Sequence, residues 1–227
     1  MSQGFFLTFE GLDGSGKTTQ IRKLAAWLEA RGEAPLVTRQ PGGTSIGDRI
    51  RTLLLHSKTD NLAPYTELGL MFSDRAQAIS EVIAPALNAG RIVLCDRFTD
   101  STEAYQGGGR KLGSEIVLQL HASLCGGLQP DLTLLLLPDL NKSLVRARRR
   151  NDRMERGGKD ENRFENEDEG FYQRVFDRYR EIAARETVRV VVVDRDASIE
   201  EVHRQIVRVV EDRLSKRLEA INMLPSP

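Results

Sequence analysis

The chain has 227 residues, of which 33 are basic and 33 acidic, so its formal net charge is zero. A neutral chain lacks the overall positive charge of a general nucleic-acid or membrane-surface binder, and we expect neither partner. Its two cysteines make neither a disulfide framework nor a zinc site. We see no signal peptide and no apolar run of about 18 residues, which favours a cytoplasmic protein. The chain length favours one domain, residues 1–227.

Short apolar segments alternate with longer helical patterns along the chain. Strands are predicted at residues 5–10, 35–38, 91–95, 132–137 and 188–193. Helices are predicted at residues 19–30, 46–55, 66–89, 112–124, 141–151 and 170–186, and a last helix opens at Ser198, with Glu201 completing a capping box. Pro85 is expected to bend or split the helix that contains it, and residues 222–227 are expected to fray.

The predicted strands are apolar almost throughout, which is typical of strands covered on both faces. We therefore expect an α/β fold, a five-stranded parallel sheet flanked by helices on both faces. Ligands of such folds bind outside the carboxyl ends of the strands. That edge would carry Glu10, Arg39, Asp96 and Arg97.

The segment from Gly11 to Thr18 reads GLDGSGKT and fits the phosphate-binding pattern G-x-x-x-x-G-K-[ST]. It lies between a predicted strand and a predicted helix, which is the context that the pattern requires. The glycines let backbone N–H groups surround a polyphosphate at a helix N-terminus. Lys17 would reach the β- and γ-phosphates, and the Thr18 hydroxyl would bind Mg²⁺.

Charged residues follow two further strands. Arg39 precedes a Pro-Gly-Gly loop with exposed N–H groups, and with Arg51 it would hold a second phosphate; a plain surface loop is the alternative. Asp96 lies at the position where enzymes with a phosphate-binding loop hold Mg²⁺ through water or orient a nucleophile. Arg97 beside it can bind a phosphate with two hydrogen bonds. The alternative is a helix-capping Asp beside a surface salt bridge.

Two segments offer contacts to a base and to a transition state. Gln106 carries a donor and an acceptor suited to a nucleobase edge, and the three glycines after it allow close approach or movement. Phe72 and Arg75 share a helix face, so one would stack on a base and the other bond its edge, although a core role for Phe72 is the alternative. The basic segment 146–163 can close over a phosphoryl group, or it is a solvated charged helix.

These motifs, in order, resemble those of the bacterial thymidylate kinase family, nucleoside monophosphate kinases of the P-loop kinase fold. The matching segments are FEGLDGSGKTTQ, TRQPGGT, LMFSDRAQ, VLCDRFTDSTEAYQGGGR, LQPDLTLLL and a lid, at about residues 146–165, that ends in RFE. The resemblance implies transfer of a phosphoryl group from ATP to dTMP with Mg²⁺, and a homodimer through helices near residues 66–89 and 112–124. The rivals are another nucleoside monophosphate kinase and a non-catalytic ATP-binding protein.

The resemblance also implies a role for each matched residue. ATP would contact Gly11, Asp13, Gly14, Ser15, Gly16, Lys17, Thr18 and Thr19, and Mg²⁺ would be held by Thr18 and Asp96. The dTMP site would comprise Asp13, Arg39, Arg51, Phe72, Arg75, Arg97, Thr102, Tyr105 and Gln106. Catalysis would fall to Lys17, Asp96, Arg97 and lid arginines Arg149, Arg150 and Arg153.

Three departures from the family pattern leave questions open. Gln40 replaces the Glu of the usual TREPGG. Phe72 lies three residues before Arg75 where several members have four, so Met71 is a rival for the stacking position. An insertion at 154–162 leaves the catalytic lid arginine open among Arg149, Arg150, Arg153 and Arg156.

Overall fold

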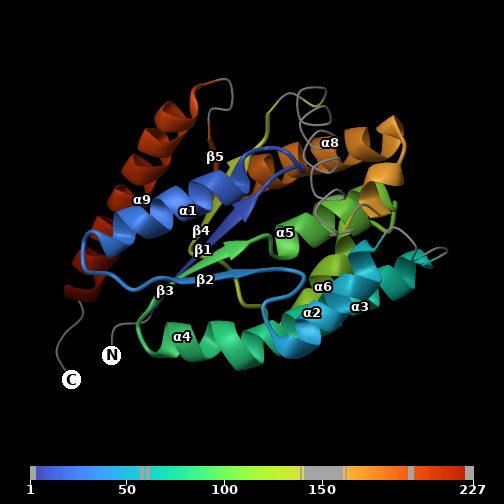
Figure 1. The fold of residues 1–227 in the computed structure, drawn as a ribbon, viewed down its shortest axis with the longest axis horizontal. Helices are drawn as coiled ribbons and strands as arrows, with labels where there is room; N and C mark the ends of the chain where they lie inside the picture. Colours follow the sequence, from blue (N-terminus) through green and yellow to red (C-terminus); the bar gives the residue numbers. More distant parts are fainter. Residues whose placement is uncertain are drawn as a thin grey trace.

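The computed structural model describes residues 4–56, 59, 62–138, 140, 161, 163–193 and 197–222. Five parallel strands form one sheet in the order β2-β3-β1-β4-β5 (Figure 1). The strands are β1 (Phe5–Glu10), β2 (Leu36–Arg39), β3 (Ile92–Asp96), β4 (Leu132–Leu136) and β5 (Val190–Val193). Each strand lies within a predicted segment or one residue beyond it, and the parallel sheet is confirmed.

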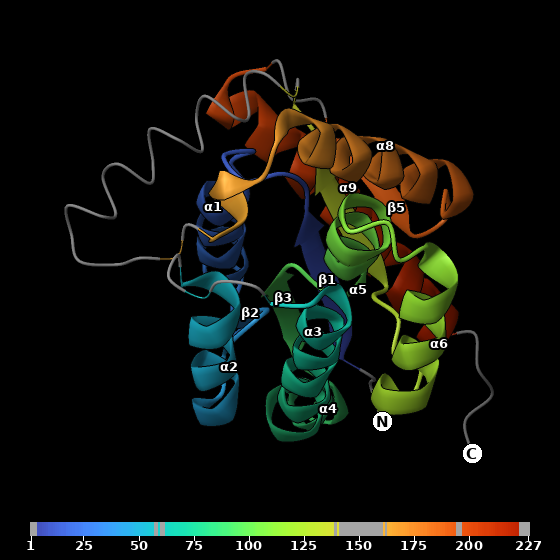
Figure 2. The ribbon, with the colours of Figure 1, turned by 90° about the vertical axis from the view of Figure 1, so that its right-hand side faces the viewer.

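Helices cover both faces of the sheet (Figure 2). They are α1 (Lys17–Glu29), α2 (Ser45–Leu55), α3 (Pro64–Ala78), α4 (Ala84–Asn88), α5 (Thr99–Thr102), α6 (Ser114–Cys125), α8 (Glu169–Arg185) and α9 (Ile199–Asn222). Two π-helical segments, η1 (Ile79–Ile83) and η2 (Glu103–Gly109), and a 3₁₀ turn, η3 (Arg163–Asn166), join them. In the described part of the chain, no helix is long and apolar enough to cross a membrane.

The two faces follow from the alternation of side chains along β1. Phe5, Leu7 and Phe9 pack on one face in a cluster with α1 and α9, which lie side by side in Figure 1. Phe6 points to the other face, where it packs with Ile83 and other residues around α4. Successive residues of a strand point to opposite faces, so a strand that is apolar throughout must be covered twice.

Two local features predicted from the sequence, the capping box at Ser198 and the helix break near Pro85, are present in the structure. The Ser198 backbone N–H donates to Glu201 Oε2 at 2.8 Å, and the Glu201 N–H donates to Ser198 Oγ at 3.3 Å, so the capping box is confirmed. The stretch that contains Pro85 is split into α3, η1 and α4. The helix predicted at 141–151, most of the lid at 146–165 and residues 223–227 lie outside the described residues.

The helical segment α5–η2 was not predicted, because a polar and glycine-rich sequence has a low helix propensity. Packing against α8 holds it. A Cβ on Gly108 would come within 2.9 Å of Arg178 Cβ, and a Cβ on Gly109 would overlap the Phe171 ring. Of the two uses expected for these glycines, close approach is therefore the one that the structure supports.

Candidate active site

The phosphate loop joins β1 to α1 at the carboxyl edge of the sheet. Gly11, Gly14 and Gly16 have φ values of +131°, +76° and +97°, which other residues rarely adopt. A Cβ on Gly11 would also collide with the Leu136 carbonyl of β4. Ser15 and Thr19 are half-buried beside these glycines at the start of α1. The loop thus has the backbone that anion binding at a helix N-terminus requires.

Lys17 is almost fully buried at the first position of α1. Its Nζ donates to the carbonyl oxygens of Gly11 and Leu12, at 3.0 and 2.9 Å. Burial, with the nearby positive charge of Arg97, lowers the pKa of Lys17 from 10.5 to about 8. An ammonium with so little water around it gains much from a phosphate neighbour.

Thr18 and Asp96 bring two oxygen ligands together between the loop and the end of β3. Thr18 Oγ1 lies 3.5 Å from Asp96 Oδ2, and Asp96 Oδ1 is buried without a hydrogen-bond partner in the described part of the chain. Mg²⁺ prefers oxygen ligands and is often held by one or two protein groups together with substrate phosphates. These residues therefore fit the predicted metal site.

Arg97 joins the phosphate loop to the predicted base-reading segment. Its Nη2 donates to Asp13 Oδ1 at 3.0 Å and to the Tyr105 hydroxyl at 3.3 Å. Its Nη1 donates to Ser101 Oγ and to the Tyr179 hydroxyl, at 3.0 and 3.2 Å. Its backbone has φ +69°, a strained conformation for a non-glycine residue that occurs often at functional sites. The guanidinium is fixed on both sides.

Two residues that hold Arg97 were missed as site residues. Tyr179 comes from α8, and its hydroxyl donates to Glu10 Oε2 at 3.1 Å. Ser101 also donates to that carboxylate, whose pKa is raised by burial and by Asp100. Tyr179 lies in an ordinary apolar stripe of α8, so no sequence signal separated it from core residues.

The Pro-Gly-Gly loop differs from the expectation in one respect. The N–H groups of Gly42 and Gly43 were expected to be exposed, yet they donate to Asp74 Oδ1 at 2.8 Å and to Asp48 Oδ1 at 3.2 Å. Of the two arginines beside the loop, Arg39 lies on the surface and Arg51 is half-buried. Arg39 is exposed and lies 3.3 Å from Asp48.

Arg51 already binds a carboxylate with two hydrogen bonds. Its Nε and Nη2 donate to the two carboxylate oxygens of Glu161, at 2.9 and 2.6 Å, and its Nη1 donates to the Pro41 carbonyl. This is the geometry with which a guanidinium holds a carboxylate or a phosphate. Arg51 is therefore oriented to receive an oxyanion.

Arg75 and Thr102 meet in the core between α3 and α5. Arg75 Nη2 donates to Thr102 Oγ1 at 2.8 Å and to the Phe98 carbonyl at 3.1 Å, while its Nε donates to Gln40 Oε1 at 2.8 Å. Its Nη1 is buried and has no partner among the described residues. Gln40, where the family has Glu, thus serves as a neutral acceptor that orients Arg75. Arg75 keeps one donor for a ligand.

The structure separates the two candidates for base stacking. Phe72 is fully buried in a cluster with Leu68, Val117 and Cys125, between α3 and α6. Met71 lies in the cluster that contains Tyr105, on the side of the predicted site. This placement favours Met71 over Phe72 as the residue that faces a base. The three-residue spacing from Phe72 to Arg75 was the sequence feature that indicated Met71 as the alternative.

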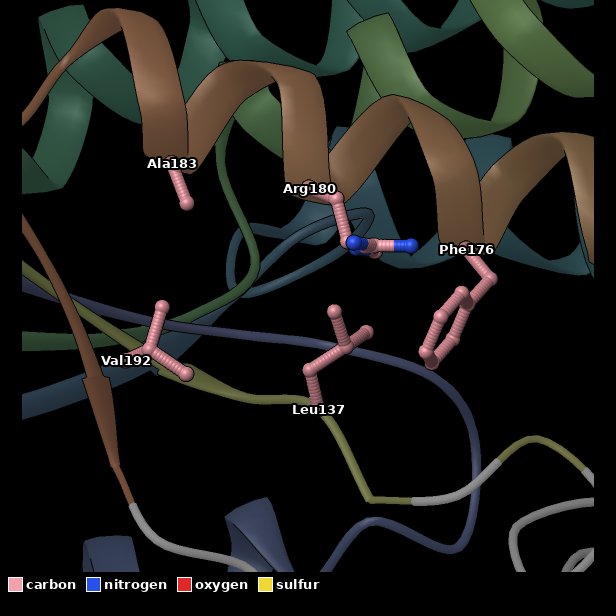
Figure 3. Close-up of a pocket in the computed structure, with 5 residues that line it drawn as sticks. All are labelled: Leu137, Phe176, Arg180, Ala183 and Val192. Atoms are coloured by element: carbon pink, nitrogen blue, oxygen red, sulfur yellow. The ribbon is translucent and has the colours of Figure 1, made fainter.

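Among the remaining predicted residues, Gln106 and Tyr105 lie buried on η2, and Tyr105 contacts Arg97. Gly14 lies on the phosphate loop and Thr18 at the start of α1. Arg149, Arg150, Arg153 and Arg156 lie outside the described residues. A cavity of about 480 Å³ opens elsewhere, between α8 and the ends of β4 and β5 (Figure 3). It is lined by Leu137, Phe176, Arg180, Ala183 and Val192, none of which is a predicted site residue.

Comparisons with known proteins agree with this geometry. The thymidylate kinase family model matches residues 9–206. The chain belongs to the thymidylate kinase family. It is 46% identical to the thymidylate kinase of Pelobacter propionicus over 219 residues, which cover 96% of this chain and 99% of the relative. It is 49% identical to that of Solidesulfovibrio magneticus over 189 residues, 83% of this chain and 90% of the relative.

A solved structure supports the same family. The crystal structure of thymidylate kinase from Ehrlichia chaffeensis aligns with a TM-score of 0.72 and 31% sequence identity, covering 92% of this chain and 99% of that one. Membership of the thymidylate kinase family makes this chain a phosphotransferase of the nucleoside monophosphate kinase class.

Proposed function

We propose that this chain transfers the γ-phosphoryl group of ATP to dTMP, giving ADP and dTDP, by direct in-line transfer without a covalent enzyme intermediate. Arg97 carries the proposal, because it bonds both Asp13 of the phosphate loop and Tyr105 of the base-reading segment. A cation fixed between donor and acceptor reduces the repulsion of two anions and stabilises charge in the transition state.

On the donor side, the phosphate loop binds ATP and Lys17 neutralises its terminal phosphates. Thr18 and Asp96 would hold Mg²⁺, which would offset the negative charge of the phosphates. The lid arginines Arg149, Arg150 and Arg153 are proposed as the further cations that stabilise the transferred group. Because a phosphate oxygen is already an adequate nucleophile, positioning and charge neutralisation supply most of the rate.

On the acceptor side, Arg39, Arg51 and Arg97 bind the phosphate of dTMP. Arg75, Thr102 and Gln106 bind the edge of thymine, and Met71 packs against its face. Tyr105, whose hydroxyl donates to Asp13, would border the sugar and exclude a 2′-hydroxyl group. We expect discrimination against ribonucleotides to depend on Tyr105.

We also propose a homodimer built on α3 and α6, in the cytoplasm where ATP and dTMP are found. Tyr65, Leu118 and Leu124 on these helices are large and exposed, and a second copy of the chain would cover them. Light scattering after size exclusion tests this: the chain should run as a dimer, and Leu118→Glu with Leu124→Glu should give a monomer.

The reaction is tested by ADP release from ATP and Mg²⁺ with dTMP, dUMP, dCMP, dGMP, AMP, UMP or thymidine as the acceptor. Strong preference for dTMP is expected, and Arg97→Ala should lower kcat about a thousandfold in a protein that still folds. Arg91→Ala removes an exposed arginine far from the loop and is the control. Turnover with another acceptor alone would indicate a different nucleoside monophosphate kinase, and ATP binding without any turnover would indicate a non-catalytic protein.

A further inference from the structure

Glu67 is a fully buried carboxylate in the first turn of α3, outside the set of predicted site residues. It accepts hydrogen bonds from three residues of two segments that are distant from it in the sequence, η2 with its C-cap and η3. Gln106 Nε2 lies 2.7 Å from its Oε1, while Arg110 Nη2 and Arg163 Nη2 lie 3.1 and 2.7 Å from its Oε2. Two guanidinium groups therefore hold the carboxylate in place and offset its charge.

The contact with Glu67 determines how the Gln106 amide is oriented. A carboxylate can only accept hydrogen bonds, so the side of the amide that faces it must be the NH₂ group. An amide turned the other way would set its oxygen against a carboxylate oxygen. The Gln106 oxygen consequently points away from Glu67. It is buried and has no partner among the described residues.

Gln106 therefore offers a ligand an acceptor, and Arg75 offers a donor. Thr102 accepts a hydrogen bond from Arg75 and lies four residues before Gln106 on one helical segment. The Arg75 donor and the Gln106 acceptor therefore lie on the same side of that segment, where one ligand can contact both. Thymine presents an acceptor at O4 and a donor at N3–H. Cytosine presents the reverse, an amino group at C4 and an acceptor at N3.

We propose that Glu67 is a positioning residue that makes the enzyme select thymine over cytosine, by fixing the Gln106 oxygen toward the N3–H of the base. The inference rests on the proposed function, in which Gln106 reads the thymine edge. Without the carboxylate, the Gln106 amide can rotate and present its NH₂ group to N3 of cytosine. A buried polar group that meets the wrong partner loses its hydrogen bond altogether, so the orientation of a single amide can decide selectivity.

The test compares Glu67→Gln with Glu167→Gln. Glu167 also pairs with Arg110, at 2.6 Å, but its contacts in the structure do not include Gln106, so it controls for a lost charge on the same arginine. Steady-state rates are measured with dTMP, N3-methyl-dTMP and dCMP. In Glu67→Gln, the ratio of kcat/KM for dTMP over dCMP should fall at least about tenfold, and the penalty for N3-methylation should fall with it. The loss for dTMP should be in KM, because Glu67 touches no reacting group.

Unchanged ratios in a folded Glu67→Gln would overturn the inference, as would equal changes in Glu67→Gln and Glu167→Gln. A wild-type enzyme without dTMP activity would instead overturn the proposed function. If Glu67→Gln does not fold, Glu67→Asp keeps the charge but draws the carboxylate back by one methylene. A ratio of kcat/KM for dTMP over dCMP below that of the wild type in Glu67→Asp supports the inference, and an unchanged ratio contradicts it.

Discussion

The ionisation of Lys17 gives a prediction that can be worked through from the structure. Burial lowers the pKa of Lys17 to about 8, so its charged fraction falls as the pH rises through 8. A phosphate beside the ammonium favours the charged form and raises that pKa again. Above pH 8, nucleotide binding must therefore take up a proton.

The size of the effect follows from linkage between proton and nucleotide binding. If Lys17 stays charged in the complex, the apparent Kd rises by the inverse of the charged fraction of the free enzyme. That factor is about 2 at pH 8 and about 11 at pH 9. ATP itself is fully ionised in this range, so the change belongs to the protein.

Isothermal titration calorimetry with a non-hydrolysable ATP analogue and Mg²⁺ measures this directly. Titrations between pH 7 and 9.5, in buffers with different ionisation enthalpies, should show proton uptake that approaches about one proton at pH 9. Lys17→Arg stays charged throughout and Lys17→Met is never charged, so neither should show it. A wild-type Kd that is constant from pH 7.5 to 9.5, or proton uptake that persists in Lys17→Met, would refute the reasoning.

Two further predictions concern stability. Burial raises the pKa of Asp74 from 3.8 to about 6, so the folded state binds this proton more tightly than the unfolded state does. The resulting contribution to the free energy of unfolding is complete below pH 3.8 and is lost as the pH rises through 6. Asp74→Asn keeps an acceptor for the Gly42 N–H; its free energy of unfolding in urea should exceed that of the wild type by about 1–2 kcal/mol at pH 8, and the difference should vanish toward pH 4. A difference that does not vary with pH would contradict this. Gly109→Ala should cost about 1–3 kcal/mol because its methyl group overlaps the Phe171 ring. Adding Phe171→Leu should recover part of that loss, whereas strictly additive effects would contradict the clash.

The sheet was predictable because each strand depends on local information. Runs such as residues 132–136 are apolar enough to need cover on both faces, and the phosphate-loop pattern marks where β1 ends. The segment 99–109 was not predictable, since its helix depends on α8, which lies 60 or more residues away in the chain. Tertiary packing overrides weak helix propensity there.

The same distinction holds within the site. Lys17, Thr18, Asp96 and Arg97 belong to short motifs, so their positions followed from the pattern. The roles of Tyr179 and Glu67 depend on which segments meet in space, and neither stands out in the sequence. The choice between Phe72 and Met71 needed only the helix orientation, because the two adjacent side chains point to different faces of α3.

The glycines of η2 have a consequence for redesign of the acceptor site. On the side of α8, the main chain of η2 packs against the Phe171 ring and the Arg178 side chain, and Gly108 and Gly109 leave no space for a methyl group. A wall made of main chain cannot change shape through side-chain rotamers. New acceptor specificity must therefore be introduced from α3, at positions such as Met71, or together with changes on α8, at positions such as Phe171.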